Sequence, residues 1–214
     1  MKVTKYEHAT LVVEEQGNKL VIDPGTFTTS LQDFSNVAGV VITHAHSDHF
    51  DKNLVEKILA ANPEAKIFTV AEVAEQLAEH QANVVTVHAG ETQTVGPFTL
   101  KFYGGKHAFI RGNMPDANNV GVLVNDSLYY PGDSFSTPDG AAVKVLALPT
   151  TAPWLKIGES IDFLEAVKPK VTFPTHDGLH NDISEQMSNG MIGNLAKEQG
   201  IDFHPLKVGE SLDI

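Results

Sequence analysis

Apolar and polar residues alternate in two parts of the chain in a way that predicts β-hairpins. Residues 10–22 read TLVVEEQGNKLVI, in which two β-rich runs are separated by the turn residues 16–19. The region from Gly90 to Val124 repeats this pattern, with short runs around turn-forming residues. We therefore predict two sets of antiparallel hairpins, one near the start of the chain and one in its middle.

Short apolar runs and helical patterns follow each set of hairpins. The runs predict buried strands at residues 37–43, 66–70, 83–88, 143–149 and 170–176. Apolar residues at helical spacing predict helices at 51–62, 71–80, 159–169 and 184–200, the last weakened by its glycines. Two such halves indicate an α/β fold in four layers, an αββα sandwich in which two mixed sheets pack face to face with helices outside. Since neither a linker nor a repeat is visible, we expect one domain over residues 1–214.

Composition narrows the chemistry and the partners. With 214 residues, 42% of them hydrophobic, the chain is long enough for a substantial core. Neither a secretion signal nor a membrane span is visible, so we expect a cytoplasmic protein with no membrane partner. A net charge of −12 disfavours nucleic acid, which favours a small-molecule substrate and leaves a homo-oligomer open. Because cysteine is absent, any metal must be held by histidine nitrogen and carboxylate oxygen.

The stretch THAHSDHF, residues 43–50, gathers potential metal ligands directly after a predicted buried strand. In an extended segment His44 and His46 project to the same side and can grip one ion together. Asp48 and His49 follow a turn and point elsewhere, so this loop can serve two neighbouring metals. Two ligands leave each site incomplete, because catalytic zinc usually has three protein ligands and an open position for water. The missing ligands should come from the ends of other predicted strands, where the chain places His107, Asp133 and His176.

This arrangement resembles the metallo-β-lactamase superfamily of metal-dependent hydrolases, with its αββα sandwich and binuclear site. The loop matches the HxHxDH motif of the family. The shared features NNVGVLV, YPGDSF, LPTTAPWLK and PTHDGL are similar to those of small stand-alone members of largely unassigned activity. The resemblance implies that the first metal is held by His44, His46 and His107, the second by Asp48, His49 and His176, and that Asp133 bridges them. It also implies that Asp23 accepts a hydrogen bond from the metal-site loop and orients its ligands.

The reaction expected of such a centre is hydrolysis. Two divalent ions would outweigh the charges of their carboxylate ligands and favour an anionic or strongly polarised substrate. A hydroxide held between the metals would attack an ester, lactone, amide or phosphodiester. Asp133 would steer the hydroxide, and Asp48 or a water could relay a proton to the leaving group. Zinc is the first choice of metal, with manganese second and iron, cobalt or nickel also compatible with nitrogen and oxygen ligands.

Loops beside these ligands are expected to form the substrate pocket. The candidates for substrate binding are Lys106, Arg111, Trp154, Lys156 and His180. A solvated surface charge explains the cations at least as well, and core packing explains Trp154 at least as well. His180 could also compete with His176 for the metal. The turn-rich segment from 105 to 119 is a candidate for closing the site. The role of His8 stays open.

Three alternatives to a small-molecule hydrolase remain at this point. The first is a nuclease or phosphodiesterase of the ribonuclease Z type, which the acidic balance disfavours. The second is a di-iron redox protein, but such members depend on a flavin domain or partner that this chain does not show. The third is a metal-binding protein without enzyme activity, for which a bridging carboxylate would serve no purpose.

Overall fold

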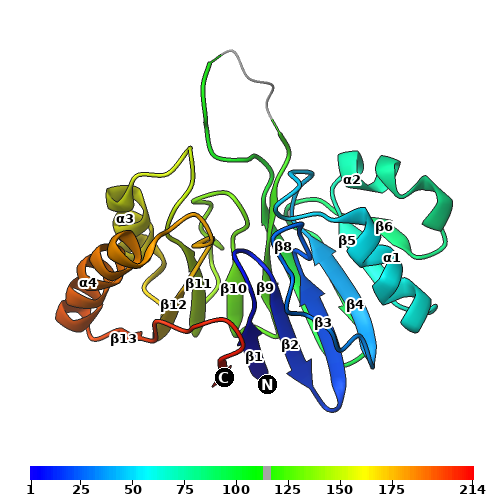
Figure 1. Cartoon of the computed structure of the whole chain (residues 1–214), viewed down its shortest axis with the longest axis horizontal. Coiled ribbons are helices and arrows are strands. Elements are labelled where there is room, and N and C mark those ends of the chain that lie inside the picture. The colour runs from blue at the N-terminus through cyan, green and yellow to red at the C-terminus, as the bar shows by residue number, and fades with distance from the viewer. Residues whose placement is uncertain (113–116) are drawn as a thin grey trace.

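The computed structural model describes residues 1–112 and 117–214 and shows two sheets between two layers of helices (Figure 1). Within the described residues each sheet has seven strands. In spatial order the first sheet contains β14 (Ser211–Asp213), β1 (Lys2–Lys5), β2 (Leu11–Glu15), β3 (Asn18–Ile22), β4 (Val37–Ile42), β5 (Lys66–Thr69) and β6 (Val84–Thr86). The second contains β13 (Asp202–Phe203), β12 (Val171–Thr175), β11 (Val145–Pro149), β10 (Leu128–Tyr130), β9 (Val120–Val124), β8 (Phe98–Gly104) and β7 (Thr92–Val95).

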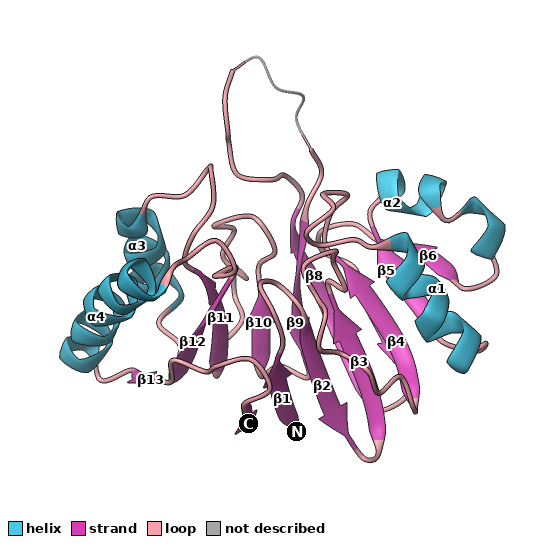
Figure 2. Ribbon diagram, in the orientation of Figure 1, coloured by secondary structure: helices cyan, strands magenta, loops and turns pink. Residues whose placement is uncertain are grey.

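Both sheets are mixed, in the same way. Pairing is antiparallel from β14 to β3 and parallel from β3 to β6; in the second sheet it is antiparallel from β7 to β10 and parallel from β10 to β13. Figure 2 shows α1 (Lys52–Ala61) and α2 (Ala71–Gln76) on one flank, and α3 (Ile157–Val167) and α4 (Asp182–Gln199) on the other. The predicted four-layer αββα sandwich with two mixed sheets is therefore confirmed.

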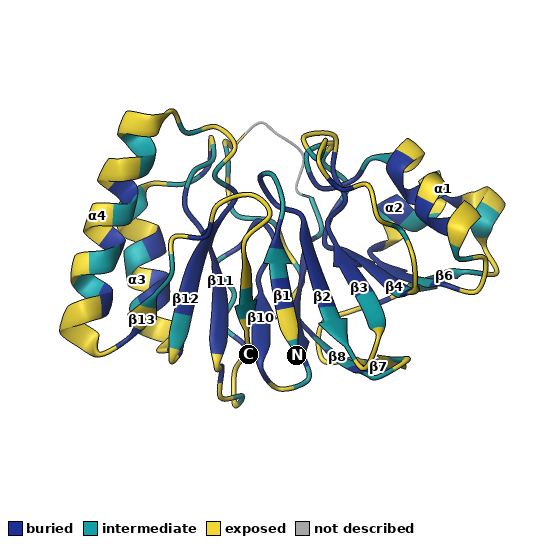
Figure 3. Ribbon diagram, turned by 60° about the horizontal axis from the view of Figure 1, so that its bottom comes forward, coloured by how far each residue is buried: buried dark blue, intermediate teal, exposed yellow. Residues whose placement is uncertain are grey.

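The burial of each element explains its sequence pattern: apolar runs in the strands and amphipathic spacing in the helices. Every residue of β9 and β11 is buried, since these strands are covered on both faces. In α1 only one stripe is buried: Leu54, Val55, Ile58 and Leu59. Figure 3 shows this contrast between buried strands and the exposed outer faces of the helices. None of the described helices is both long and apolar enough to cross a membrane.

The element boundaries differ from the predictions at a few places. The helix predicted for 71–80 ends at Gln76 and continues as one turn of 3₁₀ helix over Ala78–His80. Helix α3 begins at Ile157, earlier than predicted, because the Glu159 carboxylate accepts a hydrogen bond from the Lys156 backbone N–H at 2.7 Å and caps the helix there. Strands β1 and β14 were not predicted. They are short and pair mainly with each other and with β2.

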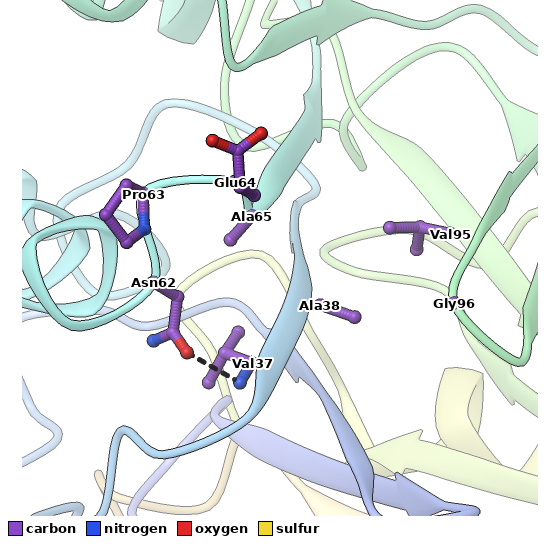
Figure 4. A pocket seen from close by; sticks show the side chains of 8 residues that line it. All are labelled: Val37, Ala38, Asn62, Pro63, Glu64, Ala65, Val95 and Gly96. Atoms are coloured by element: carbon purple, nitrogen blue, oxygen red, sulfur yellow. Dashed lines mark hydrogen bonds between the residues drawn. The ribbon is translucent and has the colours of Figure 1, made fainter.

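A pocket of about 410 Å³ opens at the amino end of β4, between the end of α1 and the β7–β8 turn (Figure 4). One polar side chain that lines this pocket, that of Asn62, forms hydrogen bonds to the backbone around it. Asn62 accepts a hydrogen bond from the Val37 N–H at 3.0 Å and donates to the carbonyls of Phe34 and Ile58. The histidine loop follows the other end of β4, so this pocket plays no part in the site.

Candidate metal centre

The histidine loop runs from the carboxyl end of β4 to the start of α1. Its backbone turns at His46, whose carbonyl accepts hydrogen bonds from the N–H groups of His49 and Phe50 at 3.0 and 2.9 Å. Asp51 then caps α1 by accepting from the Asn53 N–H at 2.9 Å. The turn separates the pair His44 and His46 from the pair Asp48 and His49.

The seven predicted ligand residues lie together at this edge of the sandwich, in two adjoining groups. The first group consists of His44, His46, His107 and Asp133, and the second of His8, Asp48, His49 and His176. Within each group the candidate ligand atoms all lie within 4.8 Å of one another. His107 comes from the loop after β8, Asp133 from the turn after β10, and His176 from the end of β12. The structure therefore brings all seven candidate residues together, and it places His8 beside the second group.

Hydrogen bonds leave the same ring nitrogen of several histidines free to point inward. The Nδ1–H of His49 donates to Asp23 Oδ2 at 2.6 Å, and that of His107 to the Ala108 carbonyl at 2.6 Å. His176 donates from Nδ1 to the Thr151 carbonyl. In the neutral ring each bond places the proton on Nδ1, so that Nε2 carries the lone pair that a metal requires.

Polar atoms at the centre of the site are buried without a partner. Among the described residues, Nε2 of His49, His107 and His176 and Oδ1 of Asp133 are buried and make no hydrogen bond of acceptable geometry. Asp133 Oδ1 lies 3.0 Å from His49 Nε2 and 3.2 Å from His176 Nε2. Such atoms are costly in a folded protein unless something satisfies them. Three imidazole nitrogens and a carboxylate oxygen directed at each other fit one or more divalent metal ions.

Asp23, which the family resemblance implied would orient the metal-site loop, contacts that loop through its carboxylate. It is fully buried, and its backbone adopts a left-handed conformation with φ of 47°. Oδ1 accepts from the Thr43 N–H at 2.7 Å, while Oδ2 accepts from the Thr43 hydroxyl at 2.7 Å, His49 Nδ1 at 2.6 Å and the Tyr130 hydroxyl at 2.9 Å. Because Thr43 uses its proton on Asp23, its oxygen can accept from His44 Nδ1 at 3.0 Å. One carboxylate thus orients two of the histidines.

A tight turn presents Asp133 to both groups. Asn119 accepts from the Asp133 N–H at 3.0 Å and donates to the Pro131 carbonyl at 2.9 Å, which clamps the turn. Between them Gly132 has φ of +64°, and a Cβ there would lie 2.4 Å from Asn119 Oδ1. Asp133 Oδ2 lies 3.3 Å from His107 Nε2, and its Oδ1 faces His49 and His176, so one oxygen faces each group.

The charges of the site are strongly coupled. Burial alone would raise the pKa of Asp133, but His49 and His176 hold the pKa well below its usual value. Burial would likewise lower the pKa of His49, yet Asp133 and Asp23 raise this pKa well above that of free histidine. For His44 burial wins, aided by repulsion from His49, and its pKa lies well below the usual value. The metal-free site is therefore an ionised carboxylate among histidines of different protonation.

His8 has a defined place in the site. It is buried, with φ of 59°, and its carbonyl accepts a hydrogen bond from the His176 N–H at 2.8 Å. Its Nδ1 accepts from the Gly178 N–H at 3.1 Å, so in the neutral ring the proton is on Nε2. Nε2 lies 3.1 Å from Asp48 Oδ2 and donates to it. His8 therefore orients Asp48 rather than offering a lone pair to a metal.

The proposed substrate-binding residues fall in different surroundings. Lys106, Arg111 and Lys156 are exposed. His180 Nδ1 lies 3.0 Å from the Ser184 hydroxyl, and His180 belongs to neither ligand group. Trp154 is buried and contacts Asp133. Residues 113–116, part of the segment expected to close the site, lie outside the described residues.

Three supporting residues were missed by reasoning from the sequence. Tyr130 and Thr43 donate to Asp23, and Asn119 clamps the turn of Asp133. Tyr130 lies in a buried strand, where an aromatic residue predicts only packing. Asn119 lies in the NNVGVLV feature. Its role depends on its complete burial beside the turn of Asp133, and the sequence alone does not show this burial.

The four-layer fold and the two ligand groups at its edge define a class, the metal-dependent hydrolases with the metallo-β-lactamase fold. A family model described as "Beta-lactamase superfamily domain" matches residues 2–176. The chain belongs to this family. It is a metal-dependent hydrolase of the superfamily, in agreement with the expectation from its histidine motif.

Known proteins resemble the chain over nearly its whole length. Protein Rv0786c of Mycobacterium tuberculosis is 35% identical over 96% of both chains. The UPF0173 metal-dependent hydrolase NEQ378 of Nanoarchaeum equitans is 26% identical over the full length of both. The metallo-β-lactamase fold protein YhfI from Bacillus subtilis superposes with a TM-score of 0.71 at 16% identity, over 99% of this chain and 98% of YhfI. The last likeness bears on the fold alone.

Proposed function

We propose that the chain is a binuclear hydrolase that cleaves an ester, lactone, amide or phosphodiester bond in a small anionic substrate. The observation that carries this proposal is the convergence of unpaired buried atoms: Nε2 of His49, His107 and His176 with Oδ1 of Asp133. In this proposal His44, His46 and His107 would hold one metal ion, and Asp48, His49 and His176 would hold the other. Asp133 could serve both ions, because one of its oxygens faces each group.

Metal ions bound there would activate a water and polarise the oxygen of the attacked group. The chain's own residues orient and hold protons around that chemistry. Asp23 orients His49 and, through Thr43, His44, by contacts to the Nδ1 atom of each ring. Asp48 is the carboxylate placed to take up or pass on a proton, since its side chain is 25% exposed whereas that of Asp133 is 3% exposed. Asp48 is therefore more accessible to solvent than Asp133.

An anionic substrate follows from the charge of the filled site. Two divalent ions would carry more positive charge than Asp48 and Asp133 remove, so the filled site would be a net positive centre in an otherwise acidic protein. Lys106 and Arg111, exposed on the segment that carries His107, are the cations proposed to meet the substrate's charge. Zinc is the proposed metal, because imidazole nitrogen and carboxylate oxygen are among its usual ligands, and manganese is the second choice for a site made of nitrogen and oxygen atoms.

Metal content measured by plasma mass spectrometry tests this proposal. Untagged protein purified without chelator is expected to hold about two transition-metal ions per chain, the number that a two-metal site requires. His44→Ala should lower this number, whereas His88→Ala, at an exposed histidine outside both groups, should not. The loaded protein is then assayed on lactones, thioesters and phosphodiesters. Wild-type protein that stays free of metal after incubation with zinc and manganese would contradict the proposal. Iron with visible absorbance would favour the redox alternative.

A further inference from the structure

Trp154, the single tryptophan of the chain, lies against the carboxylate at the centre of the site. Its indole Nε1–H donates a hydrogen bond of 2.9 Å to Asp133 Oδ2. The indole can only donate, so the direction of this bond does not depend on a tautomer. The ring is 8% exposed and packs edge-on against His107, with ring centroids 5.7 Å apart. Trp154 therefore belongs to the interior of the site rather than to an exposed substrate wall.

The bond reaches one particular oxygen of Asp133. Oδ2 is the oxygen on the side of the first group, 3.3 Å from His107 Nε2 and 3.8 Å from His44 Nε2. Oδ1 faces His49 and His176 in the second group. A carboxylate can rotate about its last bond, and this rotation would exchange or blur the two roles. The indole N–H removes that freedom by fixing Oδ2.

The segment that carries Trp154 also orients a histidine. The Thr151 carbonyl, three residues earlier, accepts the Nδ1–H of His176, and the Thr150 N–H donates to the Thr175 carbonyl at 3.0 Å. The connection between β11 and α3 is thus tied to the end of β12. One short segment therefore sets both the ring of His176 and the carboxylate of Asp133.

We propose that Trp154 is a positioning residue for the metal centre: its indole N–H fixes the Asp133 carboxylate so that one oxygen faces each ligand group before metal binds. This inference rests on the proposed binuclear function. Holding the carboxylate lowers the entropy that would otherwise be lost on metal binding, and partners of this kind typically change metal affinity about 10–100-fold. The effect should be larger for the first group, because the indole acts on the oxygen that faces it.

The test compares variants that separate the N–H donor from the shape of the ring. Trp154→benzothienylalanine keeps the bicyclic ring and replaces the N–H by sulfur, whereas Trp154→Phe removes both. Phe135→Leu is the matched packing control, since Phe135 contacts Trp154 at 5.3 Å between ring centroids without bonding to Asp133. Zinc alone is titrated into each metal-free protein in competition with a chromophoric chelator, and thermal unfolding of each metal-free protein is recorded.

The expected result is a loss of about tenfold or more in zinc affinity for Trp154→benzothienylalanine. Its unfolding temperature should match that of the wild type, and Phe135→Leu should keep wild-type affinity. Trp154 emission in the wild type should change in step with zinc binding, and this change should disappear in Asp133→Asn. If the wild type binds zinc and Trp154→benzothienylalanine binds it equally well, the inference is wrong while the proposed function stands. If the wild type binds neither zinc nor manganese, the proposed function itself fails. Should Trp154→Phe not fold, the isosteric variant decides.

Discussion

At the scale of single residues, the site depends on side chains that hold the ligands as much as on the ligands. Three residues of the site have a left-handed backbone although they are not glycine: His8, Asp23 and His176, with φ between 47° and 59°. Such conformations cost free energy and persist where the surrounding structure enforces them. These three residues lie at the two ligand groups, so the surrounding fold enforces an unfavourable backbone conformation at this edge of the sandwich.

Asp23→Asn tests the most connected of these residues. An amide cannot replace the carboxylate, because one of its two ends donates, while four donors already point at the two oxygens. We expect the free energy of unfolding to fall by roughly 3 kcal/mol, as for the loss of one partner in a buried ionic network. Zinc affinity should fall about 10–100-fold, because His44 and His49 lose their orientation. Urea unfolding and zinc titration measure the two effects.

The matched control for Asp23→Asn is Tyr130→Phe, which removes one of the four donors and leaves the carboxylate intact. It should cost only about 1 kcal/mol and keep most of the zinc affinity. Equal losses in both variants would mean that general core packing, rather than the carboxylate, supports the loop.

At the scale of elements, the loop after β3 and the histidine loop act as one unit. The Thr26 N–H donates to the Ser47 carbonyl at 2.8 Å, and the Asp51 N–H donates to the Pro24 carbonyl at 2.9 Å. Gly25 lies between these bonds and is buried. A Cβ there would lie 1.8 Å from the Asp48 carbonyl oxygen, which no side-chain movement can relieve. This contact joins backbone atoms of two loops that are more than 20 residues apart, so it could not be predicted from the residue types.

Gly25→Ala should therefore displace the histidine loop. We expect a loss of roughly 2–3 kcal/mol in the free energy of unfolding, typical of overpacking, together with weaker zinc binding. Gly190→Ala is the matched control: Gly190 lies within α4, and a Cβ there has no atom within 4 Å. It should stabilise the protein by about 0.5–1 kcal/mol, because alanine favours a helix over glycine. Chemical denaturation of both variants distinguishes these signs, and an unaffected Gly25→Ala would refute the coupling of the two loops.

At the scale of the whole molecule, the four layers of the fold could be predicted from local patterns in the sequence. The contacts between residues far apart in the chain, including those that support the candidate ligands, could not. Apolar runs such as Val145–Pro149 and the stripe of α1 carry a local signal, because burial on both faces or on one face dictates residue type. Strand β14 has no such signal. It exists because the chain's end returns to pair with β1, a contact between residues more than 200 positions apart. The support of Asp23 by Tyr130 is equally non-local, since it joins the two sheets.

Closing the sandwich around several histidines should make the metal-free protein sensitive to acid. Burial lowers the pKa of His8 despite its bond to Asp48, and that of His44, helped by repulsion from His49. Burial, with repulsion from His107, lowers the pKa of His46 as well. A histidine whose pKa is lower in the folded state stabilises the fold above about pH 6.5, the pKa of the unfolded chain. This contribution is lost as the pH falls from there towards the folded-state pKa.

His49 behaves in the opposite way but does not compensate in that range. Its pKa is raised by Asp133 and Asp23 despite burial, so below about pH 6.5 it is protonated in both the folded and the unfolded chain. Its stabilising effect is already complete there and changes no further. Denaturant unfolding of chelator-treated protein should therefore show a steady fall in stability between about pH 6.5 and pH 5. His44→Gln should make this fall shallower, whereas His88→Gln, at an exposed position, should leave it unchanged. Stability that is constant or rises over this interval would mean that the buried histidines are not held neutral by the fold.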